Sequence, residues 1–140
     1  MVIYEDAAVD DIAVEGKAYS WKRPNCKNCK SKVWGHGFVA RYFNSFSNSL
    51  WIRRWRCPYC GTVYICRPRD YWSRFQESIS NIFKSLIYRV THMKWPPWCT
   101  RQKGGHWIRK LIDNARVNLL LKKSVLETIL FYQDKKLAIN

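Results

Sequence analysis

Two short cysteine motifs decide the fold of this sequence: CKNC at residues 26–29 and CPYCG at residues 57–61, with 27 residues between the two pairs. A gap of two residues lets the backbone curl into a tight knuckle, so that both thiolates of a pair face one ion. Gly61 supplies the permissive φ that such a turn commonly needs, and Pro58 fixes φ near a turn value. Two such pairs in a reduced chain predict one zinc ion. Its predicted ligands are Cys26, Cys29, Cys57 and Cys60.

The residues between and after the pairs predict a zinc ribbon. Residues 33–43 are rich in β-forming side chains, residues 44–49 read as a loop, and residues 50–56 alternate large apolar residues with arginines. That alternation is typical of a half-buried strand, and residues 62–66 predict a third strand. A ribbon of this size buries little apolar surface, so bound zinc would supply much of its folding free energy.

Other chemistries for the cysteines stay open. The same four ligands suit an iron site of rubredoxin type, and a CxxC pair also serves dithiol redox enzymes, although no βαβ unit is visible here. Cys66 and Cys99 lie outside the pairs and are expected to pack as small apolar side chains, with a ligand role left open for Cys66. The three histidines are expected to be structural or to face phosphates. They are His36, His92 and His106.

The periodicity of the chain changes after residue 69. Apolar residues recur at three- and four-residue steps from Phe75 to Val90, which predicts an amphipathic helix. The prolines of residues 94–98 end it, because neither can donate an amide hydrogen. Thr100 can cap a second helix, and the two glycines at 104–105 move its expected start towards His106.

Ser124 and Glu127 have the spacing of a capping box, which predicts a third helix near residues 124–134. Residues 117–121 either extend the second helix or link it to the third. The predicted fold class is α+β, a small β zinc ribbon followed by a three-helix, helix-turn-helix-like unit. The sequence therefore divides into three predicted segments: an acidic N-terminal segment over 1–20, the ribbon over 21–69 and the helical domain over 70–140.

The charge of the chain points to a polyanionic partner. The 140 residues carry a formal charge of +15, with 25 Lys and Arg against 10 Asp and Glu. Residues 1–20 hold five acidic and one basic side chain, whereas residues 21–140 hold 24 basic and 5 acidic ones, a net +19. Such an excess attracts phosphates and makes nucleic acid, most simply duplex DNA, the expected partner.

The expected DNA contacts fall into two groups. In the ribbon, basic residues around the knuckles would contact phosphates: Lys22, Arg23, Lys27, Lys30, Lys32, Arg53, Arg54 and Arg56. In the second helix, Arg101, Gln102 and Lys103 are expected to reach base edges, and Arg109, Lys110 and Arg116 the phosphates. A basic helix face is also often simply solvated, so a small helical bundle remains the alternative.

Several ordered motifs resemble a known group of proteins. They include CKNC at 26–29, VWGHGF at 33–38, LWIRRWRCPYCG at 50–61 and HWIRKL at 106–111. Over roughly residues 20–112 the chain resembles the zinc-ribbon and helix-turn-helix front end of bacterial insertion-sequence transposases. The resemblance implies a cytoplasmic DNA-binding protein, associated with a transposon or regulatory, with the four paired cysteines as zinc ligands.

The chain departs from that group in one respect. Transposases of this kind carry three acidic metal ligands on an RNase H-like fold. After residue 69 this chain has only five carboxylates, on predicted helices and without the needed sheet. They are Asp70, Glu77, Asp113, Glu127 and Asp134. No strand-transfer activity is expected, and since no nucleophile–base set or phosphate loop can be assembled, the chain is not expected to be an enzyme.

Two other functions remain as alternatives. One is binding to RNA or single-stranded nucleic acid, with aromatic residues as stacking platforms: Trp34, Tyr42, Trp51, Trp55 and Tyr59. The other is a protein-interaction module of a larger nucleic-acid assembly, in which residues 1–20 pair with a basic surface. The C-terminal helix is a candidate for homodimerisation. No membrane span or secretory signal is recognised, so the chain is expected to be cytoplasmic.

Overall fold

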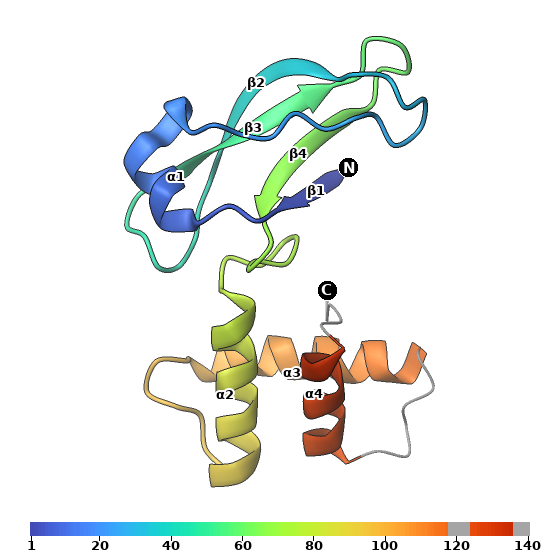
Figure 1. Ribbon diagram of the computed structural model, residues 1–140. Helices are drawn as coiled ribbons and strands as arrows, with labels where there is room; N and C mark the ends of the chain where they lie inside the picture. Colours follow the sequence, from blue (N-terminus) through green and yellow to red (C-terminus); the bar gives the residue numbers. More distant parts are fainter. Residues whose placement is uncertain (118–123, 136–140) are drawn as a thin grey trace. The chain divides into compact units, whose positions relative to one another are not determined.

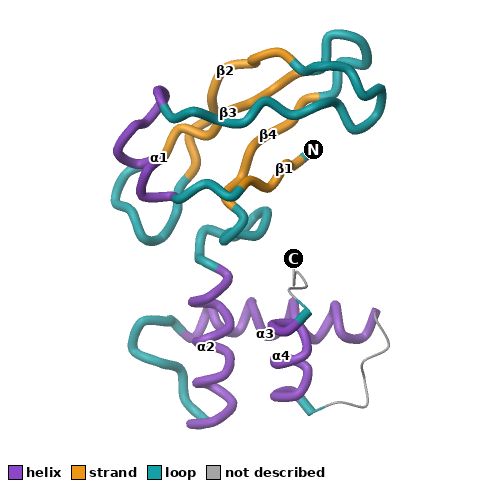
Figure 2. Tube along the Cα trace, in the orientation of Figure 1, coloured by secondary structure: helices purple, strands orange, loops and turns teal. Residues whose placement is uncertain are grey.

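The computed structural model describes residues 1–117 and 124–135, and the chain divides into two compact units, Met1–Gln76 and Glu77–Asn140. Within the described residues the strands belong to the first unit and the three longest helices to the second, as Figure 2 shows. The molecule is therefore α+β, as the sequence predicts. Residues 117–121 are predicted either to extend the second helix or to link it to the third, and of these 118–121 lie outside the described residues.

The first unit is built on a four-stranded sheet with the order β1-β4-β3-β2. Its strands are β1 (Val2–Glu5), β2 (Trp34–Arg41), β3 (Leu50–Arg56) and β4 (Val63–Pro68). The last three are the strands that the sequence predicts, and they pair antiparallel. Strand β1 adds a parallel partner for β4 at the edge, with Val2 opposite Ile65 and Glu5 opposite Pro68.

Residues 1–20 are part of this unit. Besides β1 they form the short helix α1 (Val9–Glu15) and the 3₁₀ turn η1 (Gly16–Ala18), which the sequence analysis did not predict. Ile12 is fully buried in the same core as Ile52 and Tyr64. The N-terminal ammonium donates a hydrogen bond of 2.9 Å to the carbonyl of Val63. The acidic segment thus folds onto the ribbon, because its few apolar residues complete the core.

The first unit also extends beyond residue 69. The ring of Tyr71 packs edge-on against Phe43, with 4.7 Å between the ring centroids. The Arg67 guanidinium donates hydrogen bonds to the carbonyl oxygens of Tyr71 and Phe75. These contacts join residues 70–76 to the sheet, so the predicted first helix loses Phe75 and begins only at Ile79.

The second unit contains helices α2 (Ile79–His92), α3 (Arg101–Val117) and α4 (Val125–Asp134), with α3 running across the other two in Figure 1. Ser78 caps α2, and Ser124 caps α4 in the predicted capping box with Glu127. The Lys103 N–H donates to the Thr100 hydroxyl at 3.3 Å, so Thr100 caps α3 as expected. The helix begins at Arg101, and the predicted start near His106 is wrong.

Tight packing explains the first of the two glycines in α3. Gly104 is buried, and a Cβ atom there would overlap the indole ring of Trp95, whereas a Cβ at Gly105 meets nothing within 4 Å. Gly104 thus lets Trp95 lie directly on the helix. The link from Met93 to Thr100 also holds Trp98, whose indole N–H donates to the Ser85 hydroxyl at 3.0 Å. This link is longer than the usual helix-turn-helix turn.

Among the described residues, no helix is both long enough and apolar enough to cross a membrane.

Candidate metal centre and basic surfaces

The four paired cysteines form one cluster at the end of the sheet. The loop before β2 and the loop between β3 and β4 approach each other there (Figure 1), and all four sulfur atoms lie within 4.8 Å of one another. Between the pairs, the Sγ atoms of Cys26 and Cys60 are 3.5 Å apart and those of Cys29 and Cys57 are 3.3 Å apart. Four sulfur atoms bound to one zinc ion at about 2.3 Å lie about 3.8 Å apart in a tetrahedron. The cluster therefore fits a metal ion.

The two knuckles are built alike. In the first, the Cys26 N–H donates to the Ser31 carbonyl and the Lys30 N–H donates to the Cys26 carbonyl. In the second, the Cys57 N–H donates to the Thr62 carbonyl and the Gly61 N–H donates to the Cys57 carbonyl. Gly61 has φ +69°, as its sequence position predicts, and Lys30 takes φ +61° at the equivalent place. The same backbone turn thus presents both pairs to a common point.

Hydroxyl groups surround the sulfur atoms. Ser31 Oγ lies 3.1 Å from Cys29 Sγ and 3.3 Å from Cys57 Sγ, Thr62 Oγ1 lies 3.2 Å from Cys60 Sγ, and the Tyr64 hydroxyl lies 3.2 Å from Cys26 Sγ. Outer groups of this kind orient metal ligands and tune their basicity. The sequence analysis did not identify these three residues, although Ser31 and Thr62 each follow the second cysteine of a pair by two positions.

The environment favours the thiolate form of two ligands. The backbone N–H of Cys60, followed by the Ser31 hydroxyl, lowers the pKa of Cys57 to about 6. The Tyr64 hydroxyl and the N–H of Cys29 lower the pKa of Cys26. Both side chains are buried, while Cys29 and Cys60 are exposed. Because metals bind thiolates, the lowered pKa values of these two cysteines favour binding of a cation.

The other two cysteines lie apart from the cluster. Cys66 belongs to β4 and is fully buried; its S–H donates to Glu5 Oε1 at 3.2 Å and its sulfur accepts the Trp55 indole N–H at 3.1 Å. Burial, and then the negative charge of Glu5, raises the pKa of Cys66 to about 12. Burial also raises the pKa of Cys99. All six cysteines lie in the described part of the chain, and none forms a disulfide there.

The predicted basic contacts of the ribbon are not equally available. Five of them around the first knuckle are exposed: Lys22, Arg23, Lys27, Lys30 and Lys32. Of the three arginines in β3, only Arg56 is exposed. The Arg53 guanidinium carbon lies 4.7 Å from the ring centre of Phe38 and 4.9 Å from that of Trp55, so this arginine packs on the sheet. Arg54 is half-buried as well, with its Nε atom shielded from solvent.

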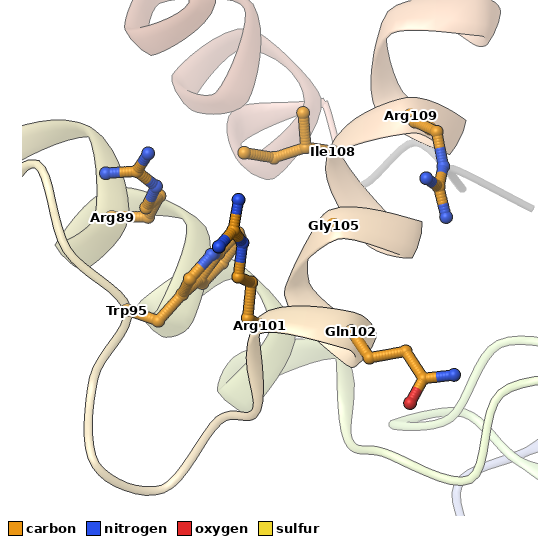
Figure 3. Close-up of a pocket in the computed structure, with 7 residues that line it drawn as sticks. All are labelled: Arg89, Trp95, Arg101, Gln102, Gly105, Ile108 and Arg109. Carbon is orange, nitrogen blue, oxygen red and sulfur yellow. The ribbon is translucent and has the colours of Figure 1, made fainter.

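The helical unit gathers some of its basic residues around a cleft of about 600 Å³, drawn in Figure 3. The lining residues come from α2, α3 and the link between them: Arg89, Trp95, Arg101, Gln102, Gly105, Ile108 and Arg109. The Arg89 guanidinium lies over the Trp95 ring, 5.7 Å from its centre. In the part of the chain that the structure describes, neither Arg101 nor Arg109 has an ion pair.

Two predicted contacts of α3 lie elsewhere on the helix. Successive residues of an α-helix are separated by about 100°, so Lys103 and Lys110 point away from the face that carries Arg101 and Arg109. They do not line the cleft, although both are exposed. Arg116 is exposed about two helical turns beyond Arg109 and falls on the same face. The helix therefore presents its arginines together and its two lysines separately.

Comparison of the chain with protein-family models, with curated proteins and with solved structures gave no match.

Proposed function

We propose that the protein is a zinc-dependent DNA-binding protein without a catalytic domain of its own, associated with a transposon or regulatory. The single observation that carries the proposal is the cluster of four cysteine sulfur atoms in a chain of formal charge +15. The ion would fix the shape of the first unit, and the basic residues of both units would bind the phosphates. The resemblance to the DNA-binding part of insertion-sequence transposases supports the same function.

Zinc is the proposed metal because four thiolates in a closed tetrahedron are typical of structural zinc sites. Iron binds the same ligand set, so metal analysis of the purified protein is the first experiment. One zinc ion per chain is the expected result. A protein that retains iron with a visible absorption band from thiolate ligands would contradict the choice of zinc.

The cleft of Figure 3 supports duplex DNA as the partner. Arginine pairs with phosphate or with guanine, and glutamine pairs with adenine in the major groove. Arg101, Gln102 and Arg109 share one helix face, so this face would enter the groove and Lys103 would not. Four exposed basic residues of the first knuckle would add phosphate contacts that are independent of sequence: Lys22, Lys27, Lys30 and Lys32.

A salt titration tests this mode of binding. With roughly six phosphate contacts, affinity for duplex DNA is expected to fall about a thousandfold between 50 and 200 mM salt. Arg101→Gln and Arg109→Gln should each lower affinity and flatten the salt dependence, measured by fluorescence anisotropy. Lys94→Gln removes the same charge from an exposed position outside the cleft and serves as the control. Affinity that does not respond to salt would contradict the proposal.

Binding to single-stranded nucleic acid or RNA is the second candidate, because most of the predicted stacking residues are exposed. The exposed fractions are 64% for Trp34, 61% for Tyr42, 39% for Trp51 and 82% for Tyr59, whereas Trp55 is 8% exposed and belongs to the core. Competition between a duplex and its separate strands distinguishes the candidates. The second candidate is favoured if the parent binds the single strand but not the duplex, and if Trp34→Ala and Trp51→Ala lose the single-strand binding.

A further inference from the structure

A second cleft, of about 470 Å³, lies in the first unit, and its lining includes none of the residues predicted to contact duplex DNA. Parts of β1, β2 and β4 and the segment after β4 line it: Val2, Ala40, Arg41, Tyr42, Ile65, Arg67, Ser73, Arg74, Phe75 and Gln76. Three of these residues are arginines and none is acidic. We propose that this cleft is a phosphate-binding site formed by the guanidinium groups of Arg41, Arg67 and Arg74.

Arg67 is the central group of the site. It is half-buried in β4, and two of its N–H groups donate to the carbonyl oxygens of Tyr71 and Phe75. A guanidinium has five N–H donors, so donors remain for a ligand. Burial lowers the pKa of Arg67, and the positive charge of Arg41 lowers it further. The hydroxyls of Tyr4 and Tyr71 act in the opposite direction but do not cancel the shift. The charged side chain is therefore held at a cost that a bound anion would offset.

Arg74 adds a second unusual feature. Its φ is +70°, a conformation that favours glycine, and yet the position carries a long cationic side chain on the lining of the cleft. The neighbouring backbone is fixed on both sides: the Ser73 N–H donates to the Tyr4 hydroxyl at 3.0 Å, and the Phe75 N–H donates to the Trp72 carbonyl at 3.1 Å. Strained residues of this kind concentrate at binding sites.

Two carboxylates of the N-terminal segment are used by other groups. Asp6 pairs with Arg69 at 3.0 Å. Glu5 accepts the backbone N–H of Lys22 and the S–H of Cys66. In the described part of the chain, no ion pair joins a carboxylate to the three arginines of the cleft. Val2, Ile65 and Phe75 line the same cleft, so attraction for an anion is strongest at Arg67, the half-buried arginine of the three, whereas Arg41 and Arg74 are exposed.

Phosphate matches this site better than a carboxylate does. Guanidinium groups bind phosphate oxygens in pairs, and phosphate offers enough oxygens and charge for several arginines at once. The phosphate has two sources, the backbone of a nucleic acid or free inorganic phosphate. The first source rests on the proposed DNA-binding function, whereas the second is independent of it.

Calorimetric titration of the intact metal-bound protein with inorganic phosphate tests the site, with acetate as the control anion. Arg41→Gln and Arg74→Gly should each weaken phosphate binding about tenfold, the loss expected for one hydrogen bond between charged groups. Arg74→Gly suits the positive φ and so retains the fold. Lys94→Gln controls for the lost charge, and Met93→Gly, at φ +57° in the second unit, controls for the backbone change. Both controls should bind phosphate like the parent.

Two results would overturn the proposed site: the absence of saturable phosphate binding, or phosphate binding that Arg41→Gln and Lys94→Gln weaken equally. The same variants are then titrated with a short duplex at constant salt. Parallel losses for phosphate and duplex identify the nucleic-acid backbone as the source, and a loss for phosphate alone identifies free phosphate. A parent protein that binds phosphate but no DNA supports the cleft and contradicts only the proposed function.

Discussion

The hydroxyl oxygen of Tyr64 lies 3.2 Å from the sulfur of Cys26, and the same oxygen accepts the backbone N–H of Lys27 at 2.9 Å. A thiolate carries no hydrogen, so the Tyr64 hydroxyl donates to the sulfur when Cys26 is ionised. Tyr64 is fully buried in β4, so it ties the first knuckle to the core of the sheet. Metal binding and folding of the first unit are therefore expected to be coupled.

Tyr64→Phe should weaken metal binding by roughly 10- to 100-fold, the usual effect of removing a group that hydrogen-bonds to a metal ligand. Competition with a chromophoric chelator measures the affinity. Tyr59→Phe removes the same hydroxyl from an 82% exposed ring in the second knuckle and should leave the affinity unchanged. Equal metal affinities for the two variants would contradict a role for the Tyr64 hydroxyl in supporting Cys26 as a ligand.

The two glycines of α3 should respond to alanine in opposite directions. Gly104→Ala is expected to destabilise the helical unit by about 1–3 kcal/mol, because its methyl group would overlap the Trp95 ring that packs on the helix there. Gly105→Ala should be neutral or stabilise the unit by up to about 1 kcal/mol, since alanine has the higher helix propensity and the position is open. Urea unfolding followed by tryptophan fluorescence measures both. Equal effects would disprove the contact.

The thiol of Cys66 should be unreactive in the metal-bound protein. Its pKa is raised to about 12 by burial and by Glu5, so the thiolate form appears only as the pH approaches that value. At pH 8 roughly one molecule in ten thousand carries the thiolate. Iodoacetamide labelling followed by mass spectrometry should leave Cys66 unmodified at pH 8 and modify it in urea. Modification at the rate of a small free thiol would show that the side chain is accessible.

The N-terminal segment offers a prediction about stability. Ile12→Ala should cost about 2–5 kcal/mol, because Ile12 is fully buried in the core. Val14→Ala, at a side chain 87% exposed, should cost almost nothing. Deleting residues 1–20 would remove β1 together with the acidic charge, so it cannot test inhibition by that charge.

Asp10→Asn with Asp11→Asn tests inhibition without disturbing the sheet, since both side chains are exposed in α1. Tighter DNA binding by this double variant, beyond the change expected from net charge alone, would support an inhibitory role in cis. Val14→Ala serves as the control for the helix. Unchanged affinity would show that the segment is a part of the fold and not an inhibitor.

Local sequence was sufficient to predict the existence of β2, β3, β4 and the three longest helices, but not β1 or α1. Cysteine spacing identified the four clustered residues, the alternation of Leu50–Arg56 predicted β3, and the Ser124 capping box predicted α4, because each signal is contained within a few neighbouring residues. The parallel pairing of β1 with β4 was not predictable in this way. It joins residues more than 60 positions apart, and β1 has only four residues with no turn to fix its partner.

Tertiary structure alone decided which side chains share a site. Arg53 and Arg54 look like exposed cations in the sequence but are half-buried on the sheet, and Gly104 looks like a helix breaker until Trp95 covers it. The convergence of Arg41, Arg67 and Arg74 on one cleft likewise depends on strands that meet only after folding. Sequence patterns report the periodicity of one element, whereas burial and shared clefts depend on which elements come to lie against one another.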